Sequence, residues 1–257
     1  MPSLTRINIY PIKSLGGCDV SAATVLASGA LEGDRRYALV DSWGNFVNGK
    51  SCAEIHAIRA HYEMSLDSVT LSHQRMEKKF SIADEREAIA EWCSEVLEVK
   101  CRMMENTDYG FPDDSDAPGP TLVSTASLAQ VADWFPGLDL PEIRRRVRAN
   151  LEVDDTPPFW EDGLVTERQK IRRFRIGDVV WQGRGVCERC VVPTRDSQDG
   201  TVRQGFARVF AEQRQQCLPE WSPDERFDHF YRLGINTGID NVEAGNAIRV
   251  GDVVELV

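Results

Sequence analysis

Apolar and polar residues alternate over short stretches of the chain, which predicts a protein built largely from β-strands. In the N-terminal part this alternation predicts strands over Thr5 to Tyr10, Val20 to Leu26 and Arg36 to Val40. The third should form a hairpin with Phe46 and Val47, because the intervening Asp-Ser-Trp-Gly-Asn is typical of a turn.

Helical periodicity is clearest from Glu85 to Val99, where apolar residues recur on one face and acidic residues lie opposite. Cys93 lies on the apolar face and is therefore expected in the core. Farther along, Thr121 to Leu128 predicts a short strand that runs into a helix capped by Ser124 or Thr125.

The C-terminal part returns to strand patterns. Strict alternation from Val147 to Val153 predicts a half-exposed strand, with the alternative that Arg148 and Asn150 line a polar pocket. Two similar strand–Gly-Asp–strand units, Phe174 to Val180 and Ile248 to Val254, suggest two corners of one β-barrel.

A composition break divides the chain. Asn106 to Pro120 is rich in Asp, Pro and Gly and predicts a loop or linker, so we expect one domain over residues 1–110 and a second over 111–257. Val202 to Gln213 predicts a helix on the outside of the second domain's barrel. The fold class expected is β-rich α+β, with an N-terminal β-barrel-like domain and a C-terminal β-barrel with peripheral helices.

Composition narrows the functional classes. The net charge of −11 argues against a nucleic-acid partner, which needs a basic surface. No apolar run approaches the roughly 20 residues that cross a bilayer, and no signal peptide is evident, so a cytoplasmic protein without membrane contact is expected. Seven scattered cysteines fit reduced thiols better than a disulfide framework. His56 and His61, five residues apart, are expected to face solvent.

The most informative chemical motif is a Cys-x-x-Cys formed by Cys187 and Cys190, with arginines at 184, 189 and 195. Such a pair can be half of a zinc site, a dithiol redox pair or an accidental pair. The zinc interpretation lacks a second Cys or His pair. The dithiol interpretation is weakened because Val191-Val192-Pro193 looks extended, whereas thioredoxin-type pairs open a helix.

Two other stretches could bind an anion. Lys13 and Ser14 precede two glycines after the first predicted strand, and such a turn can hold a phosphate, although a solvated turn lysine is the simpler interpretation. Arg35 precedes another strand and would act as an anion clamp if it pointed inward, because a guanidinium binds phosphate in a fork.

The order of the motifs resembles the MOSC family with its N-terminal β-barrel domain, and is similar to the mitochondrial amidoxime-reducing component and its bacterial relatives. The motifs that carry the resemblance occur in sequence over nearly the whole chain: Tyr10-Pro11-Ile12-Lys13-Ser14, Gly33 to Val40, Leu122 to Leu128, Arg148-Ala149-Asn150 and Cys187-Glu188-Arg189-Cys190.

This resemblance implies a molybdenum cofactor, a metal held by a pterin dithiolene and one protein thiolate, here Cys190 as metal ligand and catalytic residue. It further implies that the pterin and its phosphate are held from both domains, by Lys13, Ser14, Arg35, Thr125 or a neighbour, Arg148 and Asn150. Cys187 stays open between a residue that tunes the metal and a small buried side chain.

The function implied is a molybdenum-cofactor oxidoreductase that reduces small N-hydroxylated or N-oxide compounds. No ferredoxin-type cysteine spacing is present, so electrons are expected from a separate ferredoxin- or cytochrome-type donor with its reductase. Two alternatives remain. One is a cofactor-binding or sulfur-handling protein without turnover, since MOSC domains also occur in molybdenum-cofactor sulfurases, whose pyridoxal-phosphate domain the sequence lacks. The other is a zinc-stabilised β-barrel.

Overall fold

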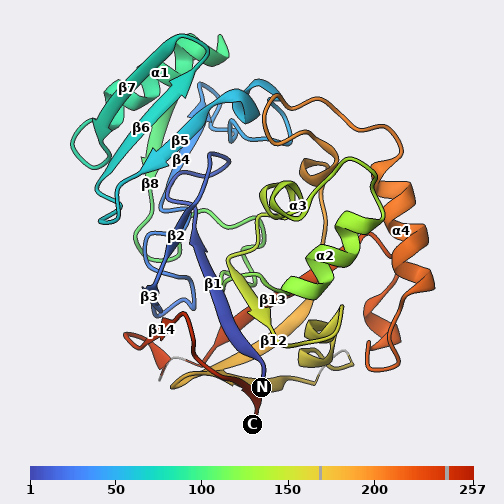
Figure 1. Cartoon of the computed structure of the whole chain (residues 1–257). Coiled ribbons are helices and arrows are strands. Elements are labelled where there is room, and N and C mark those ends of the chain that lie inside the picture. Colours follow the sequence, from blue (N-terminus) through green and yellow to red (C-terminus); the bar gives the residue numbers. More distant parts are fainter. Residues whose placement is uncertain (168–169, 241–242) are drawn as a thin grey trace.

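The alternating stretches fold mainly into one large sheet. The computed structural model describes residues 1–167, 170–240 and 243–257 and shows a strand-rich α+β fold (Figure 1). The largest sheet has eight strands in the order β15-β11-β12-β13-β9-β10-β1-β2. These strands are β1 (Ser3–Ile9), β2 (Cys18–Val20), β9 (Leu122–Ser124), β10 (Leu151–Asp154), β11 (Arg172–Ile176), β12 (Val179–Glu188), β13 (Arg232–Ile239) and β15 (Val254–Leu256).

This sheet joins the two ends of the chain. β1 pairs antiparallel with β10, and Ile7 lies opposite Leu151. The register shifts between Leu4 and Arg6, and this bulge lets Leu4 and Ile7 face the same core although they are three residues apart. The small sheet of β3 (Ala22–Thr24) and β14 (Ala247–Arg249) adds a second link between the ends. Both termini lie at the same side of the molecule (Figure 1).

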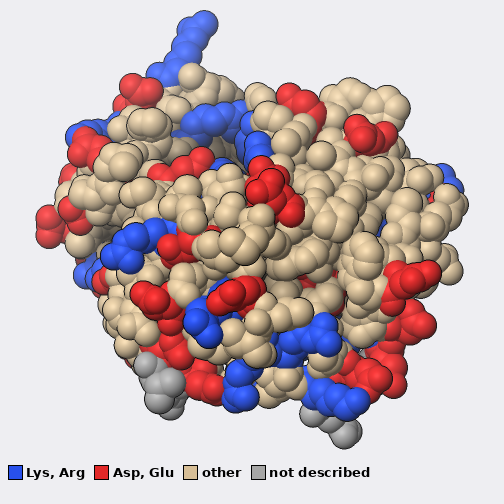
Figure 2. All heavy atoms as spheres, turned by 60° about the horizontal axis from the view of Figure 1, so that its bottom comes forward, with Lys and Arg blue, Asp and Glu red and all other residues tan. Residues whose placement is uncertain are grey.

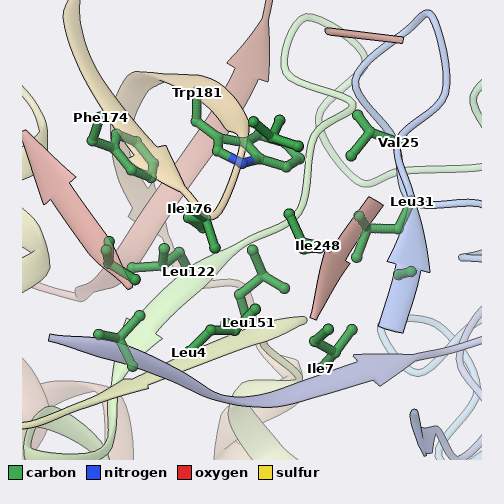
Figure 3. Packing of buried hydrophobic residues seen from close by; sticks show 14 of the residues in the cluster. Leu4, Ile7, Val25, Leu31, Leu122, Leu151, Phe174, Ile176, Trp181 and Ile248 are labelled. Atoms are coloured by element: carbon green, nitrogen blue, oxygen red, sulfur yellow. The ribbon is translucent and has the colours of Figure 1, made fainter. Parts of the chain in front are cut away.

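The core of the large sheet contains aliphatic side chains around one tryptophan. Figure 3 shows Trp181 from β12 among side chains of β9, β10, β11 and β14. Trp181 and Phe174 are fully buried, and Ile248 reaches the same core from β14. Burial of each such side chain stabilises the fold by roughly 1.5–3 kcal/mol, so this cluster holds the sheet together.

A second core lies on the N-terminal side. Its helix α1 (Arg86–Leu97) packs close to β8 and β7 at the edge of the molecule (Figure 1). Cys93 is fully buried there, which confirms its place in the core, and burial raises the pKa of its thiol. The remaining elements here are β4 (Tyr37–Asp41), η1 (Glu54–Ala57), β5 (Arg59–Tyr62), β6 (Ser68–His73), β7 (Met76–Ser81) and β8 (Cys101–Glu105).

A third core gathers aromatic side chains between helices. The Phe135 and Phe206 rings stack at 4.1 Å, and Phe206 opens α4. The helices α2 and α4 lie on the side of the molecule away from α1 (Figure 1). The helical elements of this half are α2 (Thr125–Asp133), α3 (Leu140–Val147), η2 (Trp160–Leu164), η3 (Val192–Thr194), α4 (Phe206–Gln216) and η4 (Asp224–Arg226).

Several local predictions are confirmed. The helix predicted over residues 85–99 is α1, and Ser124 caps α2 by accepting a hydrogen bond from Ser127 N. The two Gly-Asp units are both turns, with Gly177 at φ 57° and Gly251 at φ 98°. The strands of the first unit, β11 and β12, pair with each other, whereas those of the second pair with β3 and β11.

Other local predictions are wrong. The strand predicted over residues 147–153 begins only at Leu151, because α3 continues to Val147 and Arg148 ends it in the left-handed conformation. Residues 191–193 are not extended, since the single-turn helix η3 begins at Val192. The strand predicted over 20–26 is divided between β2 and β3, and the helix predicted from Val202 begins at Phe206.

The surface carries both signs of charge. Figure 2 shows Lys and Arg interspersed with Asp and Glu on the face that it presents. Within the described ranges, no helix is both long and apolar enough to span a membrane.

Candidate functional site

A cavity of about 370 Å³ brings together segments that are far apart in the sequence. It lies among the turn after β1, the loop between β8 and β9, the end of α3 and the end of β12. Its size falls in the range of small-molecule and cofactor sites. Six cationic side chains line it against four acidic ones, in a chain whose net charge is −11. The cavity is therefore a locally positive site in an acidic protein.

Nearly all the candidate residues meet here. The lining includes Lys13, Ser14, Arg35, Arg148, Asn150, Cys187 and Cys190. Thr125 is the exception, because it begins α2 outside the lining and its hydroxyl donates to Val153 O at 3.4 Å. The neighbouring Thr121 does line the cavity.

Three lining residues have unusual backbone conformations. Ser14, Arg35 and Arg148 have φ values of 73°, 48° and 56°, in the left-handed region that non-glycine residues rarely adopt. Each turns the chain sharply where its side chain borders the cavity. Conformations of this kind cost of order 1–3 kcal/mol each and cluster at functional sites, which supports a functional role for the cavity.

Asn150 is the hub of the polar network. It is 2% exposed, and its amide nitrogen donates to Asn8 O at 3.0 Å and to Asp34 Oδ1 at 2.9 Å. Its oxygen accepts from Arg35 Nη1 at 3.2 Å and from Thr121 N at 3.3 Å. Asn150 therefore ties β10 to β1 and holds Arg35 in place.

Two arginines flank the Tyr10 ring. The guanidinium carbons of Arg35 and Arg148 lie 5.1 Å and 4.2 Å from the ring centroid. Burial would lower the pKa of Arg35, but the ion pair with Asp34 raises it overall. Burial lowers the pKa of Arg148, whose guanidinium donates to Leu15 O at 2.8 Å. Among the described residues Arg148 has no carboxylate ion pair of this kind, so it is the more available of the two for an anion.

Lys13 is buried rather than solvated. It is 6% exposed, and its ammonium lies 2.7 Å from Asp113 Oδ1 and 2.9 Å from Phe111 O. Burial lowers the pKa of Lys13, although Asp113 opposes the shift. Lys50 lies 3.4 Å from the same carboxylate oxygen.

Cys187 lies near the end of β12, and Cys190 follows shortly after the strand ends at Glu188. Both are half-buried, and Cys190 Sγ accepts a hydrogen bond of 3.5 Å from Val192 N at the start of η3. Arg189 Nη1 lies 3.2 Å from Cys187 Sγ, and its other terminal nitrogen contacts Val147 O. Burial would lower the pKa of Arg189, but the adjacent sulfurs raise it. Of the three arginines near the motif, Arg189 lines the cavity and Arg184 and Arg195 do not.

The dithiol interpretation regains one argument, since η3 replaces the extended segment expected after Cys190. A zinc cluster finds no support, because the described residues contain no group of three or more metal-binding side chains.

Several lining residues were not singled out from the sequence. His56 was expected to face solvent, but it is half-buried in the cavity wall with Nε2 3.3 Å from Gly49 O, whereas His61 is exposed. Burial lowers the pKa of His56, and nearby arginines add to that effect. Asp34 could have been found from its place beside Arg35, and Asp113 from its acidic loop. Lys50 and Asn236 carry no comparable signal in the sequence.

Comparison with known families decides the classification. The MOSC N-terminal beta barrel domain matches residues 1–100, and the MOSC domain matches residues 120–255. The chain belongs to the MOSC family. The expected relationship is therefore confirmed.

Similar curated proteins are named molybdenum cofactor sulfurases. The chain is 24% identical to molybdenum cofactor sulfurase 2 of Culex quinquefasciatus over 247 residues, which cover 78% of this chain and 31% of that protein. It is 25% identical to molybdenum cofactor sulfurase 1 of Aedes aegypti, over 77% of this chain and 30% of that one. It is 26% identical to the molybdenum cofactor sulfurase of Drosophila mojavensis, over 74% of this chain and 27% of that protein. The MOSC chain thus spans less than a third of the length of these relatives.

Proposed function

We propose that this MOSC protein binds the molybdenum cofactor in the cavity and reduces N-hydroxylated or N-oxide compounds with electrons from a separate donor protein. The observation that carries the proposal is that Cys190 shares one cavity with a surplus of cationic side chains. A thiolate is a soft ligand that suits molybdenum, and guanidinium and ammonium groups suit a phosphate. The donor set therefore fits a metal–pterin group with an anionic tail.

The residues divide into distinct roles in this proposal. Cys190 holds the metal, and the hydrogen bond from Val192 N orients its sulfur. Arg148 and the two lysines at positions 13 and 50 bind anionic groups, while Asn150 fixes Arg35 through the hydrogen bonds described above. When bound, the cofactor supplies two-electron oxygen-atom transfer at the metal.

A second function is favoured by the relatives. Because the similar curated proteins are named cofactor sulfurases, the chain could bind the cofactor or handle its sulfur without turnover of its own. Both functions use the same cavity and the same cysteine, so they differ in turnover and agree in cofactor binding.

The test begins with protein expressed in a host that makes molybdenum cofactor. Molybdenum content and oxidised-pterin fluorescence are measured for the wild type, Cys190→Ala and Cys187→Ala, with Cys217→Ala as a control because Cys217 is exposed. We expect near-stoichiometric molybdenum in the wild type, Cys187→Ala and Cys217→Ala, and loss in Cys190→Ala with the fold retained. Undiminished molybdenum in Cys190→Ala would refute the ligand assignment, and zinc without pterin would refute both functions.

Turnover separates the two functions. The loaded protein is supplied with an N-hydroxylated amidine and a chemically reduced viologen dye as electron source. Dye oxidation that depends on both the substrate and Cys190 supports the reductase. A loaded protein that never oxidises the dye supports the carrier.

A further inference from the structure

In one wall of the cavity, the carboxylate of Asp113 forms ion pairs with two lysines, Lys13 and Lys50. Asp113 Oδ1 lies 2.7 Å from the Lys13 ammonium and 3.4 Å from that of Lys50. Lys13 is nearly fully buried, whereas the Asp113 side chain is 58% exposed. The carboxylate thus reaches in from solvent to neutralise a charge that would otherwise be buried alone, which is costly.

Asp113 belongs to a short segment that is anchored at both ends. Before it, Phe111 N donates to Arg35 O at 2.8 Å, and after it Gly119 packs so closely on Thr237 that a Cβ would lie 2.4 Å from Thr237 O. We call residues 112–117 the strap. Between its anchors, the strap makes polar contacts through Asp113 and through Asp114, which accepts from Asn236 Nδ2 at 3.1 Å, and its Ala117 side chain is buried.

The strap contact has the chemistry of an anion site. Burial alone would raise the pKa of Asp113, but Lys13, Lys50 and Arg35 hold it well below its usual range. Asp113 is therefore an anion at neutral pH, and it lies on the lysines that a phosphate-type group in the cavity would also approach. Pro112, Asp113, Asp114 and Ala117 line the cavity, so movement of the strap changes access to it.

We propose that the strap is a displaceable closure, in which Asp113 competes with a phosphate-type anion for Lys13 and Lys50. An anion that binds the two lysines releases Asp113, and the strap then loosens between its anchors. The inference rests on the proposed function for the identity of the natural anion. The competition itself concerns only residues of this chain.

Pyrophosphate titration of the cofactor-free protein tests this competition. Asp113→Asn is compared with Asp116→Asn, which removes the same charge from the same segment but from a side chain outside the cavity lining. We expect Asp113→Asn to bind pyrophosphate on the order of three- to tenfold more tightly than the wild type, since a partly exposed charge pair is being released. Asp116→Asn should stay within about twofold of the wild type. Equal or weaker binding by Asp113→Asn overturns the proposal.

Hydrogen exchange of the strap backbone supplies an independent measurement. Saturating pyrophosphate should speed exchange over residues 112–117 of the wild type, and Asp113→Asn should exchange fast with or without it. Lys50→Gln should also exchange faster without anion and bind pyrophosphate more weakly. Strap exchange that pyrophosphate does not change in the wild type refutes the competition. Molybdenum content of the same variants reports on cofactor binding separately, so failure of one proposal is distinguishable from failure of the other.

Discussion

Two of the places where the described residues bury charge differ in one respect, because one lines the cavity and the other does not. The second place, the sealed cluster, lies where η2, α2 and α4 meet, and its members are Ser127, Glu161, Asp162, Arg214 and Ser222. Arg214 is fully buried, with its guanidinium 3.9 Å from the Phe159 ring and 5.0 Å from the Phe227 ring. In the sealed cluster acids outnumber cations, whereas in the cavity cations outnumber acids.

The difference shows how a fold can accommodate unequal buried charge. Burial and the neighbouring Asp162 raise the pKa of Glu161 to about 7, so the surplus acid can hold a proton. Four of the six cations that line the cavity are arginines, which stay protonated at any ordinary pH, so most of the positive charge there has no such remedy. The excess positive charge of the cavity is balanced instead by solvent or by an anionic ligand. Charge composition thus separates a structural cluster from a binding site.

The largest expected effect comes from removing one arginine from each place. Arg214→Met should lower the free energy of unfolding by about 3–5 kcal/mol, because it leaves two buried acids without their cation. Arg148→Met should change it by less than about 1 kcal/mol, since the variant loses one hydrogen bond and the contact with the Tyr10 ring but relieves repulsion with Arg35. Urea denaturation of both variants measures the contrast. Equal destabilisation would show that the two places are not different in kind.

A smaller effect concerns pH. Glu161 has a folded-state pKa near 7 and an ordinary value of 4.5, so between these pH values the folded chain holds one more proton than the unfolded chain. Its contribution therefore lowers stability as pH rises through this window and is constant above it. Glu161→Gln should remove that slope and gain on the order of 2 kcal/mol at pH 8 relative to the wild type.

Urea denaturation at pH 5.5 and pH 8 measures the slope, with Glu91→Gln as a control on the exposed face of α1. The free energy of unfolding of the wild type and of Glu91→Gln should fall by the same amount between pH 5.5 and pH 8. If Glu161→Gln keeps the full slope, Glu161 is not the residue that holds the proton.

The smallest expected effect is at Thr125, which follows the lining residue Thr121 by four positions but does not itself line the cavity. Thr125→Val removes one hydrogen bond to Val153 O and should cost about 0.5–1 kcal/mol or less. Pterin and molybdenum content should equal those of the wild type. A marked loss of pterin in a folded Thr125→Val protein would place this residue in the binding site after all.

Local sequence signals predicted local structure well where one pattern dominated. The apolar face of α1 and the Ser124 cap of α2 needed no tertiary information. The Val147–Val153 alternation failed because α3 continued into it, and because the buried ion pair of Glu152 with Arg144 removed the expected exposed face. A competing helix that packs against neighbours overrides a short strand pattern.

The candidate site was found from motifs and not from periodicity. Order along the chain brought Lys13, Arg35, Arg148 and Cys190 into one hypothesis, and the cavity contains them all. What the motifs could not supply was the partner of each residue. Lys13 meets Asp113, which lies 100 positions away, and Arg189 meets a carbonyl 42 positions away. Such partners depend on the tertiary fold, so His56 and the strap were not foreseen.

The pairing of β1 with β10 also sets the order in which this protein can mature. Residues 3–9 must find residues 151–154 before Asn150 can donate to Asn8 O, so the cavity wall is completed late in folding. Pairings between such distant segments make folding slow. During synthesis β1 waits for β10 to emerge, and a ribosome-bound fragment that ends before β10 would display an unpaired edge. Chaperone demand should therefore be greatest in that interval, and ligand loading can begin only after it.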